Sequence, residues 1–146
     1  MKYLTSNLTN LFTVFALVLF PFMANAEIEP TPSPDGAQVY FVTPSDGDTV
    51  TSPIKVIFGL KGMGVAPAGI EASNTGHHHL IVDAPTPAAG APIPADANHL
   101  HFGGGQTETT IELAPGEHSL QLVLGDFLHR PHDKAVVSEV ITINVE

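Results

Sequence analysis

Short stretches in which apolar and polar residues alternate recur along the chain, each bounded by proline, glycine, aspartate or serine. Alternation with a period of two, carried by β-branched and aromatic residues, is typical of strands with one buried face. No stretch keeps apolar residues at helical spacing for long enough to predict a helix. The sequence therefore predicts an all-β fold, an immunoglobulin-like antiparallel β-sandwich of about seven strands. The clearest expected strands are residues 39–42, 53–58, 79–82, 109–113, 118–124 and 136–145.

The first 26 residues have the pattern of a secretory signal peptide. Lys2 supplies the positive charge, residues 11–20 form a short apolar run, and the cleavage site is Ala24-Asn25-Ala26. The apolar run is shorter than the roughly 20 residues that a membrane-spanning helix needs. We expect residues 1–26 to be a signal peptide of a periplasmic or secreted protein, 27–36 a proline-containing disordered leader, and 37–146 a single β-sandwich domain.

The longest interruption of the strand pattern is residues 84–97, which contain four prolines. An irregular loop of this length in a compact domain is often functional. It connects His77-His78-His79 to His99, so it is able to bring two groups of histidines to one side of the sandwich.

The composition is acidic. Removal of residues 1–26 takes away Lys2 and no acidic residue, which leaves 15 acidic side chains against four basic ones, Lys55, Lys61, Arg130 and Lys134. Four scattered cations cannot form the basic stripe that nucleic acid requires. The sequence therefore predicts no nucleic-acid partner and, after signal cleavage, no membrane span; cationic ligands are compatible with the charge.

Histidine carries the candidate chemistry. The chain has eight histidines and no cysteine, and all but one of the histidines fall into three tight groups. Neutral imidazole is the commonest metal ligand and suits both copper and zinc, so these groups favour a transition-metal site. Without cysteine, any such site is built from imidazole, carboxylate, methionine sulfur, backbone carbonyl or water.

Residues two apart in a strand share a face, so His77 and His79 point together, and so do His99 and His101. These four are the predicted metal ligands. His78 faces the other way, beside Leu80, and is interpreted as structural first and as a ligand second. Three more residues are possible ligands, namely His129 and His132 in a late loop and Met63 between two glycines. The alternative is that the histidines are solvated strand-end residues or are hydrogen-bonded to the backbone.

His118 is interpreted differently from the candidate metal ligands. It shares a strand face with Leu120, Leu122 and Leu124 and follows a Pro-Gly turn. This position is similar to the tyrosine corner of immunoglobulin-like sandwiches, in which a polar tip bonds to nearby backbone. We expect His118 to be structural.

Several motifs recur in one known family. They are Phe58-Gly59-Leu60-Lys61-Gly62-Met63, Gly76-His77-His78-His79-Leu80, His101-Phe102-Gly103-Gly104-Gly105-Gln106-Thr107-Glu108 and Leu113-Ala114-Pro115-Gly116-Glu117-His118. Residues 38–145 resemble a family of small secreted bacterial domains of unknown function. The resemblance implies a one-domain secreted sandwich and carries no activity or ligand.

The sequence thus predicts a secreted histidine-rich β-sandwich that binds a copper or zinc ion without catalysis. One alternative is a pH-responsive module that contacts another envelope protein through its histidines without metal. A further alternative is an enzyme similar to copper-zinc superoxide dismutase, also a β-sandwich with histidine ligands.

Overall fold

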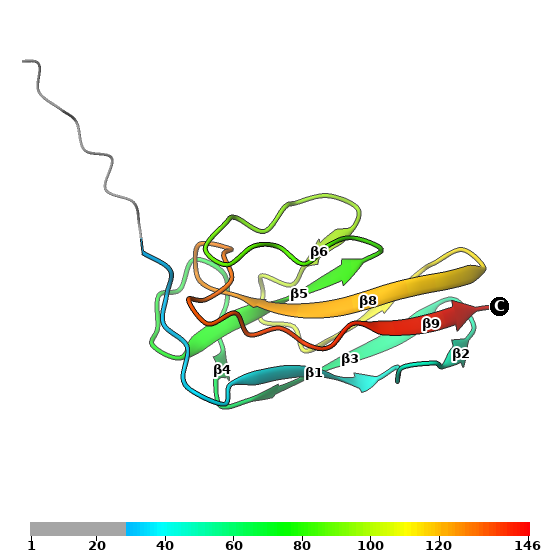
Figure 1. The fold of residues 1–146 in the computed structure, drawn as a ribbon, viewed down its shortest axis with the longest axis horizontal. Coiled ribbons are helices and arrows are strands. Elements are labelled where there is room, and N and C mark those ends of the chain that lie inside the picture. The colour runs from blue at the N-terminus through cyan, green and yellow to red at the C-terminus, as the bar shows by residue number, and fades with distance from the viewer. Residues whose placement is uncertain (1–28) are drawn as a thin grey trace, which may run out of the picture.

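The computed structural model describes residues 29–146, and these form strands and loops without a helix (Figure 1). The predicted all-β sandwich is confirmed. Two strands of two residues each, β2 and β4, make the count nine rather than about seven. The strands are β1 (Gln38–Thr43), β2 (Thr49–Val50), β3 (Ile54–Lys61), β4 (Gly64–Val65), β5 (Thr75–Val82), β6 (His99–His101), β7 (Glu108–Ile111), β8 (Gly116–Gly125) and β9 (Ile141–Val145).

Two sheets face each other. The smaller has the order β1-β3-β7; the larger has the order β2-β9-β8-β5-β4, with β6 paired to β5. Pairing is antiparallel except where β2 meets β9 and β4 meets β5. None of the described residues forms a helix with the length and hydropathy needed to cross a membrane.

The expected strand 136–145 is interrupted at Ser138. Its amide still donates to the Leu122 carbonyl, but the Leu122 amide donates to the Ser138 hydroxyl, which in turn donates to the carbonyl of Glu139. One of the two main-chain bonds to β8 is thus replaced by a side-chain bond. Only Ile141–Val145 continue as β9, while Val137 keeps a single bridge to Val123 of β8.

The main core lies between the sheets, where alternate side chains of both meet. Val39 and Val56 of the smaller sheet and Leu80 and Leu122 of the larger one are fully buried. Each such leucine contributes about 1.5–3 kcal/mol through burial. This inner face fixes which residues of β5 point outward.

The outer face of the larger sheet is covered as well. Ile81 and Val123 pack there against Ile93 from the proline-rich loop 84–97. Strand β5 is consequently buried on both faces, which is why it reads as a continuous buried run from Gly76 onward. His77 and His79 share this outer face with Ile81, so the loop packs beside them.

Residues 29–36, the described part of the predicted leader, run along the loop that follows β8. The Ser33 amide donates to Asp133 Oδ1, the Ser33 hydroxyl donates to the Lys134 carbonyl, and Lys134 forms an ion pair with Asp35. The sequence does not predict these contacts, because their partners lie near the other end of the chain. Residues 1–26, the predicted signal peptide, lie outside the described residues.

Candidate metal centre

The pairing of β5 with β6 brings two histidine groups together. His79 lies directly opposite His101 in the antiparallel register, and directly opposed residues point to the same face. His77, two residues before His79, points there too. Three imidazoles therefore gather on the outer face of the larger sheet.

A fourth imidazole comes from the loop after β8. That strand ends at Gly125, which is paired with His77, so the chain leaving it starts next to the histidines. The loop turns back at once, with the Asp126 amide donating to the Arg130 carbonyl at 2.8 Å. His129 lies in this turn with a left-handed φ of 60°. The turn thus directs His129 toward β5.

The four rings form one mutual group. All six centroid distances are short: 4.7 Å for His77–His79, 5.0 Å for His77–His101, 4.9 Å for His77–His129, 5.1 Å for His79–His101, 6.1 Å for His79–His129 and 4.6 Å for His101–His129. Four imidazoles around one tetrahedral ion, each bound at about 2 Å, have centroids about 5 Å apart. One nitrogen from each of His77, His101 and His129 lies within 4.8 Å of the others. The nitrogens of these three residues suit a single ion, and the ring of His79 lies beside them although its nitrogens are not part of this set.

The inner two rings have unsatisfied nitrogens. His77 is 0% exposed and His79 is 2% exposed. Neither nitrogen of His77, nor Nδ1 of His79, makes a hydrogen bond. A buried polar group without a partner costs about 1–3 kcal/mol. A bound ion satisfies such a nitrogen through its lone pair, which gives these rings a partner that the described protein does not supply.

Burial and the neighbouring imidazoles keep the rings of His77, His79 and His101 neutral. Burial, with the neighbouring His129 and His101, lowers the pKa of His77 to about 4. Burial, with His77 and His101, lowers the pKa of His79 to about 3. The pKa of His101 is lowered by partial loss of solvent around its ring and by His129. The lone pairs are therefore free for a metal ion at neutral pH.

Two glycines leave room for the rings. A Cβ atom on Gly103 would lie 2.3 Å from Cε1 of His101, and one on Gly125 would lie 2.6 Å from Cε1 of His79. Real Cβ contacts are never this short, so each ring occupies space that only glycine leaves open. Gly103 stands two residues after His101 in the sequence. The glycine run after the His-x-His element is therefore the feature of the sequence that could have indicated the space for this ring.

The structure does not bring His99 into the group. Its register partner is Ile81, two residues further along the strand than His79. Its Nδ1 donates to Asp96 Oδ1 at 2.7 Å. His99 therefore points to the same face as His101 but is held by a carboxylate of the adjoining loop.

His78 lies on the inner face, as its strand position indicates. It is 0% exposed, and its ring centroid lies 5.1 Å from that of Phe58. Burial lowers its pKa, partly offset by the backbone of Gln106. Met63 also packs against the main core. His78 thus lies in the interior between the sheets and Met63 is partly buried against it, both on the other side of β5 from the histidine group.

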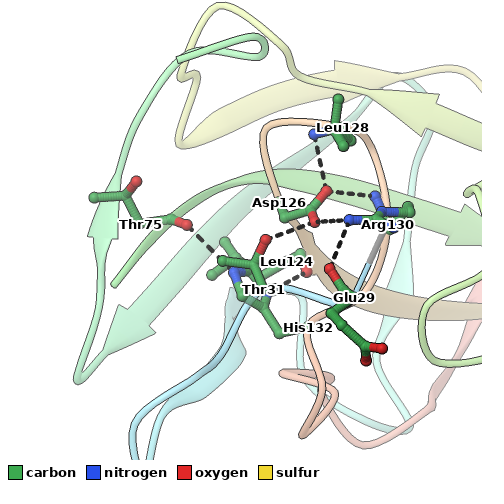
Figure 2. A network of polar contacts seen from close by, with 8 residues as sticks. All are labelled: Glu29, Thr31, Thr75, Leu124, Asp126, Leu128, Arg130 and His132. Atoms are coloured by element: carbon green, nitrogen blue, oxygen red, sulfur yellow. Dashed lines mark hydrogen bonds and ion pairs between the residues drawn. The ribbon is translucent and has the colours of Figure 1, made fainter. Parts of the chain in front are cut away.

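His132 is buried between two strands. Its Nδ1 lies 3.3 Å from the Leu124 carbonyl oxygen and its Nε2 lies 3.3 Å from that of Thr75 (Figure 2). A proton on either nitrogen thus finds a backbone acceptor. His132 joins the end of β8 to the start of β5.

Asp126 organises the loop that carries His129 (Figure 2). Its Oδ1 accepts the amides of Leu128 and Arg130, and its Oδ2 accepts the Thr31 hydroxyl and an Arg130 guanidinium N–H. Burial acts to raise the pKa of Asp126, but these hydrogen bonds and the Arg130 charge outweigh it and hold the pKa below its usual range. Asp126 is thus an ionised, fully buried anchor, which the sequence did not single out.

Comparison with known proteins gives a family but no function. A family model described as "Domain of unknown function (DUF4399)" matches residues 56–146. This range holds all four histidines of the group. No curated protein and no solved structure matches the chain.

Proposed function

The chain belongs to the DUF4399 family of unknown function, and we propose that it is a secreted or periplasmic protein that binds one copper or zinc ion without catalysis. The observation that carries the proposal is the mutual contact of His77, His79, His101 and His129. Four imidazoles converging from a strand pair and a loop are a nitrogen-rich donor set of the size that one ion needs.

The donor set selects the class of ion. Imidazole nitrogen suits Cu(II) and Zn(II), and affinities at such sites follow the Irving–Williams order, with Cu(II) above Zn(II). The chain has no cysteine, so no thiolate contributes. We therefore expect both divalent ions to bind, with Cu(II) tighter than Zn(II).

The proposed secreted or periplasmic location is inferred from the sequence. Residues 1–26 have the charge, the apolar run and the small-residue cleavage site of a signal peptide. Export places the mature chain where it meets metal ions from outside the cell.

The pH-responsive alternative needs histidines that titrate near pH 6. The pKa values of His77 and His79, about 4 and about 3, place the inner rings outside that window. This favours metal binding over pH sensing as the role of the histidine group.

The test is metal stoichiometry. The mature chain, residues 27–146 without a tag, is titrated with Cu(II) and with Zn(II), and the bound ion is counted by native mass spectrometry. The proposal expects one ion per chain and a rise in thermal midpoint that grows with ion concentration, because an ion that binds only the folded state stabilises it. Absence of a stoichiometric ion and of any such stabilisation would overturn it.

A further inference from the structure

Asp126 joins the loop of His129 to the N-terminal segment of the described chain. In Figure 2 the carboxylate lies among Leu128, Arg130 and Thr31. It is 0% exposed, and both of its oxygens accept hydrogen bonds from two groups. It therefore connects segments far apart in the sequence.

One side of the carboxylate fixes the backbone around His129. Oδ1 accepts the Leu128 amide at 2.8 Å and the Arg130 amide at 3.0 Å, so the residues on both sides of His129 are held. The His129 amide itself donates to the Asp126 carbonyl at 2.9 Å. These bonds maintain the left-handed φ of His129, a conformation that a residue with a side chain rarely adopts without support.

The other side of the carboxylate is held by the N-terminal segment. The Thr31 hydroxyl donates to Oδ2 at 2.8 Å. Arg130 donates from Nη2 to Oδ2 and to the Glu29 carbonyl, each at 3.2 Å. The Thr31 carbonyl also accepts the Asp133 amide at 3.0 Å. Residues 29–31 thus hold the loop in place through these hydrogen bonds.

We propose that Asp126 is a positioning residue for the metal site and that Thr31, through Asp126, sets metal affinity by holding His129 in place. The inference rests on the proposed function and adds to it a way in which the protein sets its metal affinity. Removing a group that orients a ligating histidine typically weakens metal binding by about 10- to 100-fold. The N-terminal segment is thereby part of the site although it supplies no ligand.

Thr31 offers a clean test because its substitution leaves every charge in place. Thr31→Val keeps the side-chain shape and removes the hydroxyl, whereas Thr31→Ser keeps the hydroxyl. Ser33→Ala is the matched control, since it removes a hydroxyl of the same segment that bonds to the Lys134 carbonyl instead of Asp126. Zn(II) affinity is measured by competition with a chromophoric chelator, and thermal midpoint and amide hydrogen exchange are measured on the metal-free proteins.

The expected result is that Thr31→Val weakens Zn(II) binding about tenfold, the lower end of the range for groups around a metal site. Thr31→Ser and Ser33→Ala should bind as the parent does. In the metal-free protein, Thr31→Val should speed exchange of the Leu128, His129 and Arg130 amides. Asp126→Asn, which turns Oδ2 into a donor facing Arg130, should weaken binding more than Thr31→Val.

Two results would overturn the inference: parent-like affinity in Thr31→Val, or equal losses of affinity in Thr31→Val and Ser33→Ala that track their thermal midpoints. A parent chain that binds no ion overturns the proposed function instead. In that case, amide hydrogen exchange alone tests whether Thr31 holds His129 in position. Faster exchange at residues 128–130 in Thr31→Val, but not in Thr31→Ser, supports it, and unchanged exchange contradicts it.

Discussion

His101 and His129 lie with ring centroids 4.6 Å apart, although one belongs to strand β6 and the other to the loop after β8. His101 is exposed and His129 is half-buried, whereas His77 and His79 beside them are buried. The group therefore has an inner pair on a rigid strand and an outer pair at the surface. An ion would enter and leave past the outer pair, while the inner pair sets the geometry.

The stability of the metal-free protein should depend on pH. Below about pH 6.5 the unfolded chain protonates His77 and His79, while the folded state resists because their pKa values are about 4 and about 3. The unfolded state then binds more protons, so the free energy of unfolding should fall as pH decreases from 6.5 toward 4. Urea unfolding between pH 7.5 and 4.5 measures this.

His77→Leu is the control for that pH series. It replaces the inner ring by an apolar side chain and should reduce the dependence of the urea midpoint on pH. A parent midpoint that stays level across the range, or a slope unchanged in His77→Leu, would show that the inner rings are not held neutral.

Gly103→Ala should weaken metal binding and leave the fold intact. The added Cβ would meet the ring of His101, an exposed side chain that is able to swing away from the group. Isothermal titration with Zn(II) should show a loss of about tenfold or more, as expected when a ligand is displaced. Gly64→Ala is the matched control, because its Cβ makes only an ordinary contact with Thr75. Equal affinities in the two variants would contradict the packing of His101 over Gly103.

Gly125→Ala should act on stability as well. Its Cβ would meet the buried ring of His79 and come within 3.3 Å of Ile93, and neither side chain has free space to move into. Overpacking of this kind costs about 1–3 kcal/mol. Chemical denaturation of the metal-free variant beside Gly64→Ala checks this, and a parent-like unfolding free energy would be the adverse result.

His118 should matter for stability and not for metal. Its Nδ1 donates to Asp83 at 2.6 Å and its Nε2 donates to the Ala114 carbonyl at 2.9 Å. Both bonds form together only on the protonated ring, and the bond to Asp83, followed by that to Ala114, raises the pKa of His118. Its stabilisation is therefore complete below about pH 6.5 and lost as pH rises through the raised pKa.

His118→Phe keeps the bulk of the ring and removes both hydrogen bonds. It should lower the free energy of unfolding by about 1–3 kcal/mol at pH 6, with a smaller loss at pH 8.5. Zn(II) affinity at neutral pH should stay at the parent value. Weakened metal binding in a folded His118→Phe protein would show that the histidine group extends to this strand end.

Strand periodicity accounts for part of the histidine group. The period of two places His77 with His79 and His99 with His101 on common faces, and the structure has both arrangements. Which member of the second pair meets the first depends on register, which is set by pairing partners and not by the strand itself. The register puts His101 opposite His79 and leaves His99 opposite Ile81, near Asp96.

The contribution of His129 was harder to see. The sequence marks it only as a possible ligand two residues before a proline, because its loop has no periodic pattern that predicts where the side chain points. Its place depends on Asp126 and, through Asp126, on Thr31. The bonds of Asp126 to its own loop are local, but the bond from Thr31 spans 95 residues and has no signature in a single sequence. The same holds for residues 29–36, whose prolines indicate a disordered leader but whose partners lie in the loop after β8.

Alternation predicted the all-β sandwich and most of its strands, because the inner face is defined by apolar side chains such as Leu80 and Leu122. It did not predict the covered outer face. Ile93 supplies that cover from a loop whose prolines conceal any strand or helix pattern. Side chains on an outward face usually meet solvent, so the burial of His77 and His79 could not be deduced from their spacing.

The most direct measurement compares Zn(II) and Cu(II) affinity of the parent chain with that of His101→Ala and His99→Ala. Both substitutions remove one imidazole from the same short strand, yet only His101 contacts the rings of His77, His79 and His129. The account predicts one ion per parent chain, a loss of at least about tenfold in His101→Ala, and parent-like affinity in His99→Ala. Equal losses in the two variants, or a parent chain that binds no ion, would contradict it.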